Sequence, residues 1–155
     1  MEVKDFCTRE VATIAPLASL REAALAMRNR HVGSLVVMEQ GIGAARAVGI
    51  LTDRDIVGAV LAVPGARPEG IRVCDVMQTR VASVREQDGV FEVVRTMHHN
   101  GVRRLVVRGP DDVVVGVVSA EDVLRVMAGE LDRLSRAFSG AAMKEVVERR
   151  QIDLA

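Results

Sequence analysis

The chain is poor in aromatic side chains. Among its 155 residues there is no tryptophan and no tyrosine, and the three phenylalanines are Phe6, Phe91 and Phe138. Proteins that bind single-stranded nucleic acid typically stack the bases on aromatic rings, so this kind of binding is not expected. The core must be built from aliphatic side chains and methionine.

Cysteine is also scarce. Cys7 and Cys74 are the two present, too few for a disulfide-stapled secreted fold and without zinc-type spacing to any histidine. We therefore expect a cytoplasmic protein in which both thiols are structural, with a redox-sensing disulfide as the less favoured alternative. His98 and His99 are adjacent and diverge on a helix, so no metal site is expected.

Neither charge sign is in excess. The chain has 21 basic and 21 acidic side chains and a formal net charge of +0, so no global field attracts nucleic acid. The N-terminal residues are charged, and no apolar run approaches the roughly 20 residues that span a bilayer. Neither nucleic acid nor a membrane is an expected partner.

The dominant feature is an internal repeat. Residues 49–57 read GILTDRDIV and residues 116–124 read GVVSAEDVL, while residues 3–14 align with residues 73–84. The period of about 70 residues is that of a small subdomain. One such unit has too little core to be stable alone, so two units are expected to pack face to face.

Apolar periodicity and capping signals predict the same elements in both copies. In the first copy, Ser19 caps a helix whose buried stripe is Leu20, Ala23, Ala24 and Met27. In the second, Val90, Val93, Val94 and Met97 form the stripe. Each unit reads β-α-β-β-α. In the first repeat the strands are expected at 11–14, 35–38 and 47–51 and the closing helix at 53–61. In the second repeat the strands are expected at 81–84, 105–108 and 113–118 and the closing helix at 121–138.

A hydroxyl residue is followed three positions later by an aspartate at the end of each copy. Thr52 with Asp55, and Ser119 with Asp122, stand where a strand gives way to a helix. Local helix capping alone explains both pairs. The same geometry places amides, a hydroxyl and a carboxylate at a helix N-terminus, a site suited to a phosphate beside a ribose.

The C-terminal segment leaves the repeat from residue 130 onward. Leu131, Leu134 and Phe138 share one helical stripe, and a break is expected at Ser139 and Gly140. A helical tail is predicted. It either covers the module's own surface or packs on a second subunit or another partner.

At this point the sequence resembles the tandem cystathionine-β-synthase (CBS) domain pair, the regulatory Bateman module. The resemblance rests on the duplicated Asp-Val-Met-like segment before each first strand, the Val-Ala-Thr-Ile and Val-Ala-Ser-Val strands, the Gly-Val-Arg-Arg-Leu-Val-Val segment and the Gly-hydrophobic-hydrophobic-Thr/Ser-x-x-Asp motif at both ends. It implies an α+β fold of two pseudo-symmetric β-α-β-β-α repeats packed through their sheets. The expected division is repeat 1 at 1–66, repeat 2 at 67–129 and the helical tail at 130–155.

The resemblance also implies a ligand and a partner. Family members bind adenosine-containing nucleotides such as AMP, ADP, ATP or S-adenosylmethionine in two clefts, and commonly form homodimers. Asp55 and Asp122 would accept hydrogen bonds from ribose hydroxyls, with Thr52 and Ser119 beside them. The base and phosphates would be held by Thr13, Ile14, His31, Val32, Ser83, Val84, Arg103 and Arg104.

The two clefts are expected to be unequal. Arg103 and Arg104 in the second repeat correspond to Gly33 and Ser34 in the first, so phosphate-neutralising charge is present on one side only. Because side chains alternate along a strand, one of the two arginines, Arg104, is expected to face the cleft.

These observations favour a regulatory protein that senses an adenine nucleotide and signals by conformational change to an unidentified protein partner. The alternative is a ligand-free dimerisation or docking protein that uses the same fold and its tail. An enzyme is not expected, because the motifs assemble no nucleophile, general base or paired-carboxylate arrangement. No cofactor is required, and the nucleotide is a ligand.

Overall fold

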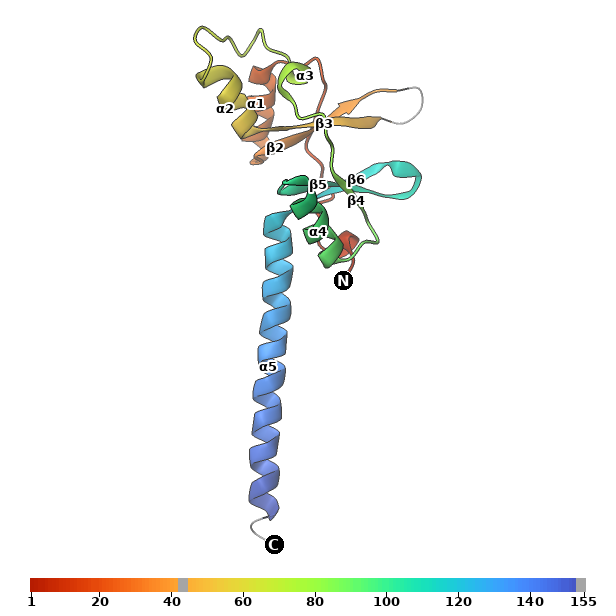
Figure 1. The fold of residues 1–155 in the computed structure, drawn as a ribbon, viewed down its shortest axis with the longest axis vertical. Helices are drawn as coiled ribbons and strands as arrows, with labels where there is room; N and C mark the ends of the chain where they lie inside the picture. The colour runs from red at the N-terminus through yellow and green to blue at the C-terminus, as the bar shows by residue number, and fades with distance from the viewer. Residues whose placement is uncertain (42–44, 153–155) are drawn as a thin grey trace. The chain divides into compact units, whose positions relative to one another are not determined.

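The computed structural model describes the backbone of residues 1–41 and 45–152 and the side chains of residues 1–41 and 45–138. The chain has two compact units, Met1–Ser119 and Ala120–Ala155. The larger unit contains both β-sheets, and the smaller unit consists of the long helix α5 (Ala120–Ile152), shown in Figure 1. The sequence-based division at residues 66 and 129 stays a prediction.

The first repeat forms a three-stranded sheet with two helices. Its strands are β1 (Thr13–Ile14), β2 (Ser34–Glu39) and β3 (Arg46–Thr52), in the order β1-β2-β3. β1 runs parallel to β2, and β2 and β3 form an antiparallel hairpin. Helices α1 (Leu20–Arg30) and α2 (Asp53–Leu61) lie side by side in Figure 1.

The second repeat has the same topology. Its sheet has the order β4-β5-β6, with β4 (Ser83–Arg85) parallel to β5 (Arg104–Arg108) and β5 antiparallel to β6 (Val114–Ser119). Helix α4 (Val90–Asn100) connects the first two strands, and α5 follows β6. The predicted α+β architecture of two β-α-β-β-α repeats with a C-terminal helix is confirmed.

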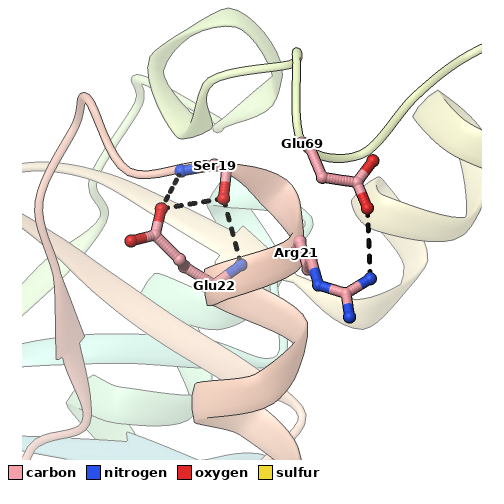
Figure 2. Close-up of polar contacts among 4 residues, drawn as sticks. All are labelled: Ser19, Arg21, Glu22 and Glu69. Carbon is pink, nitrogen blue, oxygen red and sulfur yellow. Dashed lines mark hydrogen bonds and ion pairs between the residues drawn. The ribbon is translucent and has the colours of Figure 1, made fainter.

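Helix α1 begins at a capping box that the sequence predicted only in part. The Glu22 carboxylate accepts hydrogen bonds from Ser19 N and Ser19 Oγ, both at 2.7 Å, and Glu22 N donates to Ser19 Oγ at 3.2 Å (Figure 2). The helix ends at His31, which adopts the left-handed conformation with φ 53°. Gly101 ends α4 in the same way with φ 62°, so both helices stop at the equivalent position.

The core of the first repeat lies between its sheet and its helices. It is formed by fully or nearly fully buried apolar side chains of both, which are Leu20, Ala23, Met27, Leu35, Val37, Leu51 and Val73. Val36, between two of these core residues, is also buried, as is Val106 in the second repeat. Because neighbouring strand residues face opposite sides, both faces of each sheet are covered, in agreement with packing through the sheets.

The segments that precede the first strands, residues 2–8 and 72–78, are here called the lead-ins. Each begins with a short helix that the sequence did not predict, η1 (Val3–Asp5) and α3 (Val73–Val76). Each lead-in packs on the other repeat. Val73, fully buried, belongs to the core of the first repeat, and its N–H donates to Ala18 O at 2.8 Å. Val3 N correspondingly donates to Asp88 O at 2.9 Å.

This packing of each lead-in on the other repeat, here called the crossing, continues along the sheets. Gln78 and Ile50 exchange two backbone hydrogen bonds, so the second lead-in pairs with β3. Thr8 and Val117 exchange two as well, so the first lead-in pairs with β6. Helix α3 contacts α2 and β3, although it precedes the second repeat in the sequence. Figure 1 shows it among the elements of the first repeat. The two repeats are therefore joined by reciprocal exchange of their lead-ins.

The duplicated glycine of the strand-helix motif makes this crossing possible. A Cβ atom on Gly49 would lie 2.4 Å from Met77 Sδ and 3.1 Å from Gln78 O. A Cβ atom on the equivalent Gly116 would lie 3.0 Å from both Cys7 Sγ and Thr8 O. Each glycine thus leaves room for the lead-in of the other repeat.

Two details of the prediction are wrong. Ala24 and Val94, expected in the buried stripes, are exposed. Each lies four residues after the first stripe residue, at the edge of a buried face that is narrower than the pattern suggested. The break expected at Ser139 and Gly140 is absent, because α5 continues to Ile152. A single glycine weakens a helix by only about 1 kcal/mol, which does not end it.

Candidate functional site

The larger unit contains a cavity of about 610 Å³. Its wall combines three parts of the chain: the start of α2, the second lead-in with the residues that follow it, and the segment leading into β5. The first part belongs to repeat 1 and the third to repeat 2. The crossing of the lead-ins supplies the remaining part, because Gln78 pairs with β3 and therefore lies beside the start of α2.

The predicted hydroxyl and carboxylate pair stands on this wall. Asp55 Oδ2 accepts hydrogen bonds from Thr52 N at 2.8 Å and from Thr52 Oγ1 at 2.6 Å, and Asp55 N donates to Thr52 Oγ1 at 3.3 Å. The pair is therefore a complete capping box for α2. Capping and ligand contact are compatible, because a carboxylate has about four acceptor sites.

The second carboxylate oxygen faces the lead-in. Asp55 Oδ1 accepts a hydrogen bond from Gln78 Nε2 at 3.2 Å. The carboxylate of one repeat is thus held by a side chain from the sequence of the other. With one hydrogen bond on Oδ1, acceptor capacity remains for a hydroxyl group placed in the cavity.

Both arginines of the second repeat line the cavity. The family resemblance named both Arg103 and Arg104, while strand alternation favoured Arg104 alone, and both residues belong to the wall. The physical reason is that β5 begins at Arg104, so strand alternation does not govern Arg103. Arg54 and Arg80 also line the cavity, and neither was predicted.

The other predicted residues lie elsewhere. Thr13 and Ile14 form β1, paired in parallel with β2, and are not among the residues that line this cavity. His31 and Val32, which follow α1, are also outside it. Ser83 and Val84 line a separate hollow of about 520 Å³, together with charged residues of β4, α4 and β5.

The second predicted pair is divided between the two units. Ser119 is the last residue of the larger unit, and Asp122 lies in the first turn of α5 in the smaller unit. Asp122 pairs with Arg125 across 2.9 Å within that helix. A joint role of Ser119 and Asp122 in a second cleft stays a prediction.

The described residues offer no arrangement suited to a metal ion and no helix suited to a bilayer. No three histidine, cysteine, aspartate or glutamate side chains in that part of the chain come together as a metal site would require. Cys7 and Cys74 are both half-buried. None of the helices within the described ranges is both long and apolar enough to traverse a lipid bilayer.

The comparison with protein families explains the repeat. The model of the CBS domain matches the chain twice, at residues 3–62 and 73–129. The chain therefore belongs to the CBS domain family and carries a tandem pair. The matches begin at Val3 and Val73, so each includes all but the first residue of a lead-in that packs on the other repeat.

Two curated relatives extend the likeness to most of the chain. The CBS domain-containing protein YhcV of Bacillus subtilis is 30% identical over 144 residues, which cover 93% of this chain and 94% of YhcV. The uncharacterized protein MK0525 of Methanopyrus kandleri is 31% identical over 126 residues. That alignment covers 81% of this chain but 62% of MK0525, so the chain spans less than two thirds of that relative.

A solved structure adds a ligand to the comparison. The crystal structure of the CBS domain pair of protein MJ0100, in complex with 5-methylthioadenosine and S-adenosyl-L-methionine, matches with a TM-score of 0.71 and 27% sequence identity. The match covers 84% of this chain and 98% of that structure. CBS pairs are mostly regulatory modules rather than enzymes, and the pair of MJ0100 holds two adenosine derivatives.

Proposed function

We propose that this protein is a regulatory module that binds an adenosine-containing nucleotide in the cavity between its two CBS repeats. The observation that carries the proposal is the convergence of the Thr52 and Asp55 corner of repeat 1 with Arg103 and Arg104 of repeat 2 on one cavity. A hydroxyl-binding carboxylate and phosphate-binding guanidinium groups are what a nucleotide requires.

The dimensions and position of the cavity support a small-molecule ligand. Ligand pockets commonly measure about 300 to 1,000 Å³, and this cavity of about 610 Å³ falls within that range. A ligand that touches both repeats favours the arrangement in which the two walls are correctly spaced. Binding thereby shifts the population of conformations, and this shift is the signal passed to a protein partner.

The proposal is tested by calorimetry with a matched pair of variants. Asp55→Ala removes a charge-assisted hydrogen bond worth roughly 1.5 to 3 kcal/mol, so nucleotide affinity should fall about ten-fold or more. Glu22→Ala removes the equivalent carboxylate from the capping box of α1, outside the cavity. Glu22→Ala should destabilise the fold about as much as Asp55→Ala does and leave the nucleotide affinity unchanged.

Two results would contradict the proposal. One is the absence of heat from AMP, ADP, ATP and S-adenosylmethionine at millimolar concentrations. The other is an equal loss of affinity in Asp55→Ala and Glu22→Ala, which would assign the effect to capping alone.

A row of exposed apolar side chains on α5 favours the alternative function, homodimerisation without a ligand. The residues of this row follow one another at alternating intervals of three and four positions, and each is between 39% and 68% exposed. They are Leu124, Met127, Leu131, Leu134 and Phe138. This spacing is that of a coiled-coil seam, and a second copy of the chain would supply the same row. In this function the CBS fold serves as a scaffold.

Light scattering after size-exclusion chromatography distinguishes the two functions. The double substitution Leu131→Glu and Leu134→Glu should convert a dimer held by α5 into a monomer. The control Arg133→Ala removes the ion pair with Glu130 on the same helix and should leave the mass unchanged. A dimer that survives the double substitution would exclude α5 as the dimer contact.

A further inference from the structure

Four arginines converge on the cavity from both repeats. Arg54 lies in the first turn of α2, Arg80 follows the second lead-in, and Arg103 and Arg104 lie where β5 begins. Arg54, Arg80 and Arg103 are exposed and Arg104 is half-buried. Their guanidinium groups are therefore accessible to a solute in the cavity.

These four arginines have no carboxylate partner among the described residues, whereas some arginines of the same unit do. Arg9, Arg21 and Arg108 each form an ion pair with a carboxylate. Among the residues that the structure describes, none of the four cavity arginines takes part in an ion pair. Their donors remain available to a bound anion.

The acidic residues of the wall do not offset this charge. Asp53 and Asp55 are the two carboxylates among the lining residues, against four arginines, so the wall has an excess of two positive charges. Both carboxylates already accept hydrogen bonds, Asp53 Oδ1 from Arg54 N at 2.8 Å and Asp55 from Thr52 and Gln78.

The space around Arg104 shows how far its side chain reaches. A Cβ atom on Gly33 would lie 3.7 Å from Arg104 Nη2 and 3.2 Å from Asp53 Oδ2. Arg104 therefore extends from repeat 2 to the segment of repeat 1 that precedes β2. Positive charge is thus placed on both sides of the boundary between the repeats.

The cluster does not follow from the fold itself. In the sequence alignment of the two repeats, Arg80 corresponds to Glu10 and Arg54 to Glu121, while Arg103 and Arg104 correspond to Gly33 and Ser34. No equivalent position carries an arginine, and two carry the opposite charge. The arginines are a property of this one cavity.

We infer that the cavity selects the phosphate chain of a nucleoside di- or triphosphate and rejects S-adenosylmethionine. This inference rests on the proposed function and names its ligand class. Arginine pairs with phosphate oxygens in a bidentate manner, and a chain of two or three phosphates reaches more of the four arginines than one phosphate does. S-adenosylmethionine carries a sulfonium cation and no phosphate, so an excess of positive charge disfavours it.

Calorimetry with five compounds tests this selection: ATP, ADP, AMP, S-adenosylmethionine and inorganic tripolyphosphate. ATP and ADP should bind at least about ten-fold more tightly than AMP, and S-adenosylmethionine should bind most weakly of the nucleosides. Tripolyphosphate alone should bind measurably and compete with ATP. The ATP affinity should fall as salt is raised, because salt screens exposed charges.

A pair of arginine variants locates the effect. Arg80→Gln removes one exposed guanidinium from the wall and should lower ATP affinity about ten-fold while changing AMP affinity less. Arg28→Gln removes an exposed charge from α1, outside the cavity, and should leave both affinities within about two-fold. Thermal denaturation checks that both variants are folded.

The outcomes separate this inference from the proposed function. If AMP and S-adenosylmethionine bind as tightly as ATP, the selection for a phosphate chain is overturned and the nucleotide sensor stands. If tripolyphosphate binds but no adenosine compound binds more tightly than it does, the adenosine ligand is overturned and the anion site stands. If nothing binds, both are overturned.

Discussion

Gln78 donates a hydrogen bond from Nε2 to Asp55 Oδ1 across 3.2 Å. Gln78 lies in the lead-in of the second repeat, whereas Asp55 caps α2 of the first. The contact therefore joins the exchange of lead-ins to the wall of the proposed nucleotide cavity. A carboxylate that binds a ribose must be held in position, and this glutamine contributes to holding it.

Removing this hydrogen bond should weaken the fold. Gln78→Leu keeps the size of the side chain and removes the donor, which should cost about 1 kcal/mol and lower Tm by about 2 to 4 °C. Thermal denaturation followed by circular dichroism measures the change. Gln87→Leu, at an exposed position, should leave Tm unchanged. Equal values for the two variants would refute a stabilising role of the Gln78 contact.

The buried valines of the lead-ins should be as important as ordinary core residues. Val73 is fully buried in the core of the first repeat, so Val73→Ala removes two buried carbons and leaves a small cavity. The free energy of unfolding should fall by about 2 kcal/mol, measured by urea denaturation. Val63→Ala, where the side chain is 52% exposed, should change it by less than about 0.5 kcal/mol. A Val73→Ala protein as stable as the control would contradict the crossing.

Gly49 should not tolerate a methyl group. A Cβ atom there would lie 2.4 Å from Met77 Sδ and 3.1 Å from a backbone oxygen, so Gly49→Ala should push the lead-in from β3 and destabilise the protein. Gly58, inside α2, has open space where a Cβ atom would lie, and Gly58→Ala should stabilise the protein by up to about 1 kcal/mol. Opposite shifts in Tm are expected. A stabilised Gly49→Ala protein would be inconsistent with the close approach.

The capping box of α1 should make stability depend on pH. The hydrogen bonds from Ser19 N and Ser19 Oγ hold the pKa of the exposed Glu22 carboxyl below its ordinary value of 4.5. A carboxyl with a lowered pKa in the folded state stabilises the protein above that ordinary value, and the contribution is lost as pH falls through the folded pKa. Glu22→Gln should therefore lower Tm at pH 7, and the difference from the unsubstituted protein should shrink below pH 4.5.

The control for this prediction is the neighbouring ion pair. Glu69 pairs with Arg21 at 3.1 Å on the surface beside the capping box (Figure 2). Exposed ion pairs contribute little to stability, so Glu69→Gln should leave Tm nearly unchanged at pH 7. A Tm difference for Glu22→Gln that stays constant down to pH 3 would assign its effect to something other than the charged cap.

Much of the fold could be predicted because its signals are local. The helix over Asp53–Leu61 begins and ends where the cap and the apolar spacing placed it. The burial of Ala24 and Val94 could not be predicted correctly, because an apolar residue at the edge of a helix face gives the same sequence pattern whether it is buried or exposed. The continuation of α5 past Gly140 depends on many residues together rather than on one breaker.

The crossing of the lead-ins could not be predicted from one sequence. The alignment shows that Val3 and Val73 are equivalent, but it does not say on which repeat each one packs. The same limit hid Arg80, which reaches the cavity because it follows a crossed segment. Its signal was present in the repeat alignment, where Arg80 opposes Glu10, but an isolated arginine in a loop has no pattern of its own. Thr52 and Asp55 were found because they carry a motif.

The reciprocal exchange has a consequence for any attempt to divide the protein. A fragment that starts at the linker around Pro64 carries a lead-in whose binding groove has been left on the other fragment, and the converse holds for the N-terminal piece. Neither half can fill its own groove, but each can fill that of its counterpart. Two such halves, mixed as separate chains, should therefore assemble into one folded non-covalent complex.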